Sequence, residues 1–191
     1  IREAATDWLG RVEIAEDRID DRPRAFSGGM QQRLQIARNL VTGPRLVFMD
    51  EPTGGLDVSV QARLLDLLRG LVTDLGLAAV IVTHDLAVTR LLAHRLMVMR
   101  GGDVVESGLT DQVLDDPQHP YTQALFRSIP LPGADKNARP LVAIPGNFPL
   151  PHERPPGCNF GPRCDYFEDG RCNKDTRIPM ATIEGDDRHE S

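Results

Sequence analysis

The stretch Leu46-Val47-Phe48-Met49-Asp50-Glu51-Pro52-Thr53-Gly54-Gly55-Leu56-Asp57 decides the fold. Its first four residues are apolar and predict a buried strand, and the proline and glycines behind them predict a sharp turn. The strand therefore delivers two adjacent carboxylates, Asp50 and Glu51, to that turn. The first carboxylate of such a pair can hold a magnesium ion while the second faces a water molecule, which is an arrangement that nucleotide hydrolysis needs.

The next segments continue the pattern of an α/β protein. Residues Val58 to Val72 have apolar side chains at helical spacing and predict a helix that ends near Gly76. Residues Leu77 to Thr83 then form an uninterrupted apolar run, which predicts a strand buried on both faces of a parallel sheet. His84 stands at the carboxyl end of this strand, where ligands bind in such sheets. Taken alone, His84 is more often a hydrogen-bonded structural histidine than a catalytic one.

A second motif, Phe26-Ser27-Gly28-Gly29-Met30-Gln31, precedes the central strand. Ser27 is a good N-cap for a helix that runs to Gly43-Pro44. A helix entered through two glycines offers bare backbone N–H groups and a positive dipole end, which suits a phosphate. The alternative is a flexible turn followed by an ordinary cap. An amphipathic helix from Ala4 to Val12 is expected further upstream.

The remainder of the chain falls into two parts. A helix over 86–93, a hairpin over 95–108 with its turn at Gly101-Gly102, a short helix over 109–114 and a last helix over 121–128 are expected. From Ile129 onward prolines crowd the sequence, which predicts an extended appendage. We therefore expect an α/β domain over residues 1–128 with a parallel sheet, and a proline-rich irregular extension over 129–191.

Composition limits the function further. The 191 residues are 40% hydrophobic, enough for one substantial core, and no apolar run reaches the roughly 18 residues that a membrane span needs. The net charge of -6 argues against a general nucleic-acid partner. The three cysteines, Cys158, Cys164 and Cys172, are too few for a secreted disulfide framework and indicate a metal site or free thiols in a reducing cytoplasm.

Each motif is weak alone, but their order and spacing together resemble the nucleotide-binding domain of ABC-type ATPases, which has a P-loop NTPase fold. Phe26 to Gln31 looks like the signature motif, Leu46 to Glu51 like the Walker B strand, Gly54 to Asp57 like the D-loop and His84 like the switch histidine. The resemblance covers nearly all of residues 1–128.

The resemblance implies a role for each of these residues. Asp50 would hold Mg²⁺, Glu51 would orient and deprotonate the attacking water, and His84 would hydrogen-bond the γ-phosphate of ATP. Asp57 would contact a partner subunit. In this family the signature motif clamps the nucleotide of the opposite subunit, so ATP would also be bound across a dimer with a second ABC ATPase subunit. The resemblance implies that the residues binding ATP across this dimer are Ser27, Gly28, Gly29, Gln31 and Asp57.

One departure from the family pattern stands out. The segment G-x-x-x-x-G-K-[ST], which cradles the β- and γ-phosphates, does not occur in the sequence. We therefore expect this chain to be the C-terminal part of a longer protein, without the Walker A half of the domain. Alone it is expected to bind ATP poorly and to be inactive as an ATPase.

The two parts of the chain resemble different subfamilies. Residues 1–128 look like the ATP-binding subunit of the phosphonate carbon-phosphorus lyase system, whereas residues 129–191 resemble the C-terminal extension of oligopeptide and dipeptide importer ATPases. The segment Asp116 to Thr122 is shared by both. The implied partners are membrane permease subunits or the carbon-phosphorus lyase core complex, and the implied location is cytoplasmic, at the inner face of the plasma membrane in a transporter. A non-hydrolysing regulatory partner subunit is the alternative from another class.

The cysteines extend the resemblance to the importer ATPases, where four cysteines of this region can ligate an iron-sulfur cluster. Only Cys158, Cys164 and Cys172 are present here. Either a fourth lies beyond Ser191, or His189 or His152 substitutes, or no iron-sulfur cluster or zinc ion binds. Three ordinary thiols in a proline-rich tail are the alternative.

Overall fold

The chain's computed structural model describes residues 2–129, 142–147, 150–174, 176, 178–183 and 186–191. Contacts divide the chain into two units, Ile1–Leu92 and Ala93–Ser191, and each is described by itself. The sequence analysis expects a boundary between residues 128 and 129 because the proline content rises there, whereas the division into units is based on contacts between residues. The structural boundary differs because the hairpin that begins at Arg95 packs with segments near the end of the chain.

The first unit follows the expected order of elements. Helix α1 (Arg2–Arg11) leads through short turns to α2 (Gly28–Leu40), which is followed by β1 (Leu46–Asp50), α3 (Val58–Leu75), β2 (Ala78–Val82) and α4 (Leu86–Leu92). Strands β1 and β2 are parallel, with Leu46 opposite Ala78 and Asp50 opposite Val82. The carboxyl ends of both strands therefore lie at the same edge, which places Glu51 beside the residues that follow Val82.

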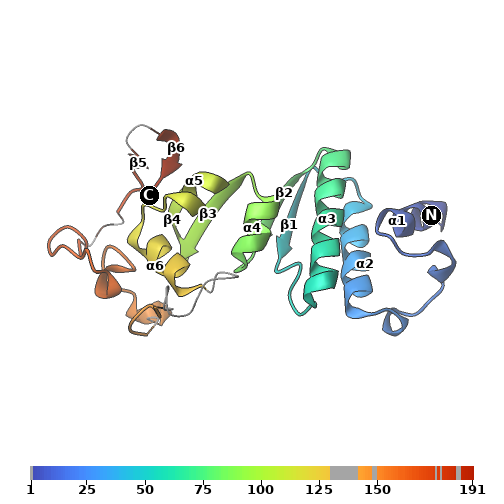
Figure 1. The fold of residues 1–191 in the computed structure, drawn as a ribbon, viewed down its shortest axis with the longest axis horizontal. Helices are drawn as coiled ribbons and strands as arrows, with labels where there is room; N and C mark the ends of the chain where they lie inside the picture. Colours follow the sequence, from blue (N-terminus) through green and yellow to red (C-terminus); the bar gives the residue numbers. More distant parts are fainter. Residues whose placement is uncertain (1, 130–141, 148–149, 175, 177, 184–185) are drawn as a thin grey trace. The chain divides into compact units, whose positions relative to one another are not determined.

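The core of this unit lies around α3, which runs between the strand pair and α2 (Figure 1). Leu64 and Leu68 of α3 are 0% and 1% exposed. They pack with Leu9 and Val12 near α1, with Ile36 and Leu40 of α2, and with the half-buried Val47 and Met49 of β1. The helical periodicity of α3 predicted its buried face correctly.

The sequence predicts that the strand over residues 77–83 is buried on both faces and that the first strand is buried, and both predictions are wrong for the residues that the structure describes. Side chains alternate between the two faces of a strand, and α2 and α3 cover only the face of Val47 and Met49. On the other face Phe48 is 69% exposed and Val82 is 55% exposed. A continuous apolar run does not distinguish a strand buried on one face from a strand buried on both, because it contains no polar residue that would mark an exposed face.

The second unit contains an antiparallel sheet in the order β3-β4-β6-β5. Its elements are β3 (Arg95–Arg100), β4 (Asp103–Leu109), α5 (Thr110–Asp115), α6 (Pro120–Ser128), β5 (Thr182–Ile183) and β6 (Asp186–Glu190). The hairpin β3-β4 and both helices lie within a few residues of their expected positions. Strands β5 and β6 were not predicted.

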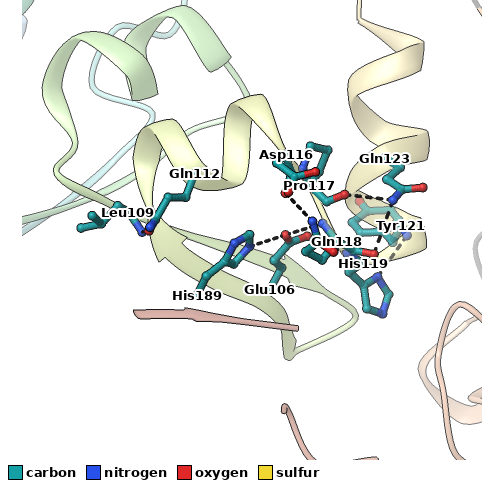
Figure 2. A network of polar contacts seen from close by, with 10 residues as sticks. All are labelled: Glu106, Leu109, Gln112, Asp116, Pro117, Gln118, His119, Tyr121, Gln123 and His189. Atoms are coloured by element: carbon teal, nitrogen blue, oxygen red, sulfur yellow. Dashed lines mark hydrogen bonds and ion pairs between the residues drawn. The ribbon is translucent and has the colours of Figure 1, made fainter. Parts of the chain in front are cut away.

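A buried carboxylate joins β6 to the rest of the second unit. Glu106 of β4 is 0% exposed, and its Oε1 lies 2.7 Å from Nε2 of His189 on β6. The same carboxylate accepts hydrogen bonds from the backbone N–H groups of Gln118 and His119, at 2.8 and 3.0 Å. Figure 2 shows Glu106 between the His189 ring and the loop that enters α6. Gly108 leaves room for that ring, because a Cβ there would lie 3.1 Å from His189.

The described parts of the tail are packed, which corrects the expectation of an extended appendage. The buried Arg100 of β3 lies over the rings of Tyr121 and Phe160, at 4.9 and 5.1 Å from their centroids. Arg154 pairs with Asp103, the first residue of β4. Cation–π and charge-assisted contacts thus join these parts of the tail to the hairpin.

Candidate functional site

The ends of β1 and β2 bring two candidate catalytic side chains into contact. Oε1 of Glu51 lies 2.6 Å from Nδ1 of His84 and accepts a hydrogen bond from the His84 backbone N–H at 3.1 Å. The His84 side chain is 88% exposed and that of Glu51 is 37% exposed. Because Nδ1 faces Glu51, the opposite ring nitrogen, Nε2, remains available for a ligand.

The backbone of Glu51 adopts a conformation that residues other than glycine rarely occupy. Its φ angle is 45°, in the left-handed region, which costs about 1–3 kcal/mol for an ordinary residue. Hydrogen bonds from its N–H to the Val82 carbonyl and from Gly54 N–H to its own carbonyl, both 2.9 Å, hold it there. The strained turn directs the carboxylate toward β2 instead of along the line of β1.

The contact makes the protonation of His84 depend on Glu51. The hydrogen bond and negative charge of Glu51, with a smaller contribution from Asp85, raise the pKa of His84 above its ordinary value. Since this folded-state pKa exceeds the unfolded one, the pair stabilises the fold fully below the unfolded pKa and loses this effect as pH rises through the folded pKa.

Replacing Glu51 with Gln is therefore expected to lower the pKa of His84 toward its ordinary value, because the carboxylate that favours the imidazolium is lost. An NMR titration of the His84 ring in the two proteins measures this. The matched control is Asp66→Asn on the exposed side of α3, where the carboxylate pairs with Arg69. An unchanged His84 midpoint in the Glu51→Gln variant would contradict the assignment.

The remaining acidic residues of the stretch have different surroundings. Asp50 is exposed at the end of β1, and its carboxylate makes no hydrogen bond or ion pair with any residue that the structure describes. Asp57 caps α3 by accepting from the N–H groups of Ser59 and Val60, both at 3.1 Å. The Ser59 hydroxyl, followed by these backbone donors, lowers the pKa of Asp57. Asp50 is thus open to a cation, whereas Asp57 already has a structural role.

The glycine turn lies at the N-terminus of α2. Ser27 caps this helix by accepting from the Met30 N–H at 3.4 Å, and the Gln31 amide donates to the carbonyls of Pro23 and Phe26. Gly28 and Gly29 face Leu56 and Val60, which flank Asp57. The structure thus brings the glycine turn to the D-loop-like segment, while no contact joins Ser27 or Gln31 to Glu51 among the described residues.

Gly29 allows α2 to approach α3 closely. A Cβ at position 29 would lie 2.5 Å from Cγ1 of Val60, whereas one at position 28 would lie 3.9 Å from Leu56. Gly29→Ala is therefore expected to lower the free energy of unfolding by about 1–3 kcal/mol. Gly28→Ala, the matched control, should change it little. Chemical denaturation measures both.

A second substitution isolates the cause of this loss. Val60→Ala removes the clashing methyl group, so adding it to Gly29→Ala should recover part of the stability that Gly29→Ala alone loses. Equal stability of the Gly28→Ala and Gly29→Ala variants would show that the close approach of the helices does not matter.

A polar network beside the Glu51–His84 pair was not predicted. Gln61 of α3 donates through Nε2 to Asp85 at 3.0 Å and to Thr53 at 3.5 Å. Asp85 also caps α4 by accepting from the Ala87 N–H at 2.8 Å. Position 61 shows no signal in the sequence, because a glutamine on the polar side of an amphipathic helix is ordinarily solvated.

Comparison with known proteins identifies the family. Residues 2–54 match the family described as ABC transporter, and residues 105–172 match the Oligopeptide/dipeptide transporter, C-terminal region. The chain is 76% identical over 129 residues to the putative phosphonates utilization ATP-binding protein PhnK of Escherichia coli K12, covering 68% of this chain and 51% of that protein. The chain belongs to the ABC-type ATP-binding proteins.

Other ABC-type proteins match more of the chain. The dipeptide transport ATP-binding protein DppD of Escherichia coli K12 is 43% identical over 173 residues, covering 90% of this chain and 52% of its own length. The chain thus spans about half the length of the curated relatives it matches. The predicted family and the resemblance of its two segments are confirmed.

A solved ABC-type structure supports the fold. The ATP-binding cassette MJ0796, a dimer bound to ADP and Pi after hydrolysis, is 32% identical and has a TM-score of 0.50, with 56% of this chain and 46% of that chain covered. The P-loop NTPase fold class is therefore confirmed.

Among the described residues, no helix combines the length and apolar character needed to cross a bilayer.

The cysteines of this ABC-type chain form no evident ligand set. No group of three or more His, Cys, Asp or Glu side chains in the described residues could hold a metal ion. Burial raises the pKa of Cys164, which disfavours the thiolate that metals bind. Of the two candidate histidine ligands, His189 is buried against Glu106 and His152 lies beside Glu153.

Proposed function

We propose that this chain forms part of an ATP-hydrolysing subunit of an ABC-type system. The observation that carries the proposal is the 2.6 Å contact between Glu51 and His84 at the carboxyl ends of two parallel strands. In this proposal Glu51 orients the attacking water and accepts its proton. His84, protonated on both ring nitrogens with its Nδ1–H on Glu51, donates a hydrogen bond through Nε2 to the γ-phosphate.

The donor set suits the nucleotide and its metal. Asp50 offers an exposed carboxylate to Mg²⁺, which prefers oxygen ligands. Mg²⁺ bound there would neutralise negative charge on the phosphates. The capped N-terminus of α2, with Ser27, Gly28 and Gly29, would bind the ATP of a second ABC subunit, with Gln31 and Asp57 supporting that interface. The dimeric state of MJ0796 supports this arrangement.

The system served is proposed to be phosphonate utilization, because of the 76% identity to PhnK. A peptide importer is the second candidate, and the match of residues 105–172 to the oligopeptide/dipeptide family favours it. The proposed partners are a carbon-phosphorus lyase core complex in the first case and membrane permease subunits in the second. A non-hydrolysing regulatory subunit is disfavoured, since Glu51 and His84 are both present and in contact.

Hydrolysis assays on the full-length protein in its assembled complex test the proposal. We expect ATP turnover that stops when EDTA removes Mg²⁺ and resumes when Mg²⁺ is restored. The 191-residue chain alone is expected to bind ATP weakly by calorimetry, since it contains no G-x-x-x-x-G-K-[ST] segment. Turnover that persists in EDTA, or tight 1:1 binding by this chain, would contradict the proposed assignment.

An iron-sulfur cluster at Cys158, Cys164 and Cys172 is proposed only from resemblance to the importer ATPases. The described side chains do not fit it, so no step of the mechanism uses it. Iron and zinc analysis of anaerobically purified full-length protein decides the matter, and protein free of both metals would end the idea.

A further inference from the structure

The contact between Glu51 and His84 is too weak to hold the two side chains in place by itself. The His84 side chain is 88% exposed, and an exposed pair of this kind contributes little free energy. Each residue also sits on a separate turn, one after β1 and the other after β2. The two turns are joined at the backbone by the Glu51 N–H bond to the Val82 carbonyl, and a side chain that bonds to both turns would further fix the separation of the two side chains.

Gln61 bonds to both turns. Its Nε2 donates to Oδ2 of Asp85, the residue after His84, and to the hydroxyl of Thr53, two residues after Glu51. Thr53 is 6% exposed, so this bridge is better shielded from water than the Glu51–His84 pair. Gln61 itself is half-buried on α3, whose core face packs through Leu64 and Leu68.

Each end of the bridge is anchored to the backbone. Asp85 uses Oδ1 to cap α4, accepting from the Ala87 N–H, so Oδ2 remains for Gln61. The Asp85 N–H donates to the Thr83 hydroxyl at 3.1 Å, which holds the turn around His84. On the other side, the Thr53 carbonyl accepts from the Leu56 N–H at 3.3 Å. A displacement of Gln61 would therefore be transmitted to both turns.

We propose that Gln61 is a positioning residue that sets the separation of Glu51 and His84 by joining Thr53 of one turn to Asp85 of the other. The expected effect of Gln61 on ATP turnover rests on the proposed function. Its effect on the separation of Glu51 and His84 does not. An uncharged amide suits the position, because it can donate to Asp85 without adding charge beside the Glu51 and Asp85 carboxylates.

Four variants test the bridge. Gln61→Leu removes both hydrogen bonds at similar size, and Gln61→Glu places a carboxylate against Asp85. The double variant Gln61→Glu/Asp85→Asn reverses the donor and the acceptor of this hydrogen bond. The new amide nitrogen at position 85 can donate to the new carboxylate at position 61, while the amide oxygen at position 85 still caps α4. Asp66→Asn, on the same helix and paired with Arg69, is the matched control.

The first readout needs no nucleotide. ¹⁵N NMR of the His84 ring, at a pH where it is neutral, reports which nitrogen carries the proton. The native protein should show the Nδ1–H tautomer, because Nδ1 donates to Glu51. The Gln61→Leu and Gln61→Glu variants should show a shift toward Nε2–H, the double variant should restore Nδ1–H, and the control should match the native protein.

The second readout is ATP turnover by the full-length protein in its complex. We expect the kcat of the Gln61→Leu variant to fall about 10- to 100-fold, with KM changed less than about twofold, and the double variant to recover most of the loss. Inactive native protein would refute the proposed function alone, because the tautomer still tests the bridge. An unchanged tautomer in the Gln61→Leu variant, whether or not its stability falls, would overturn the positioning role.

Discussion

Replacing Glu51 with Gln in the full-length protein is expected to reduce ATP turnover by at least about 100-fold, within the range that general-base catalysis supplies. Glutamine keeps the shape of the side chain but cannot accept a proton from water. It can still pair with the His84 backbone N–H through its oxygen, so the turn should persist. Steady-state hydrolysis of Mg-ATP measures the loss, and sedimentation measures whether dimers still form.

The matched control is Glu3→Gln, which removes the same charge from the exposed side of α1. It should leave both turnover and dimerisation unchanged. Unimpaired hydrolysis by the Glu51→Gln variant would remove Glu51 from the mechanism. Loss of dimers together with turnover would instead assign Glu51 a structural role.

Replacing Glu106 with Leu is expected to destabilise the second unit by about 3–5 kcal/mol, a cost typical of leaving several buried hydrogen-bonding groups without their partner. The carboxylate is fully buried and accepts from two backbone N–H groups and faces His189. Leucine would leave those donors without acceptors. Hydrogen exchange of peptides that cover β4, the loop at 116–119 and β6 measures the effect locally.

Two further variants separate the contributions to this network. Glu190→Gln alters an exposed residue next to His189 and should leave exchange unchanged. His189→Ala should release β6 while the loop at 116–119 keeps its bonds to Glu106, so its effect should be smaller than that of Glu106→Leu. Equal exchange in the native protein and the Glu106→Leu variant would show that the buried carboxylate does not stabilise the unit.

The sequence predicted those elements whose signals are local. Ser27 caps α2, Gly76 ends α3 in the left-handed conformation with φ of 59°, and the spacing of Leu64, Leu68 and Leu71 defines a core face. The Glu51–His84 contact was also within reach, since both residues follow parallel strands whose carboxyl ends share an edge.

The remaining features depend on partners distant in the chain. Glu106 and His189 are separated by 83 positions, and no periodicity links a buried strand residue to the final segment. The left-handed backbone of Glu51 was not predictable because glycine, not glutamate, ordinarily marks such a position. The bridge made by Gln61 requires three elements to be placed together before its hydrogen bonds exist.

The uncovered face of the β1-β2 pair has a practical consequence for handling this 191-residue chain. Leu46, Phe48 and Val82 expose apolar surface there, and each strand pairs only with the other among the residues that the structure describes. Open strand edges beside apolar side chains promote association between molecules. Preparations of these 191 residues are therefore expected to form larger particles as concentration rises, so light scattering should accompany every ligand titration.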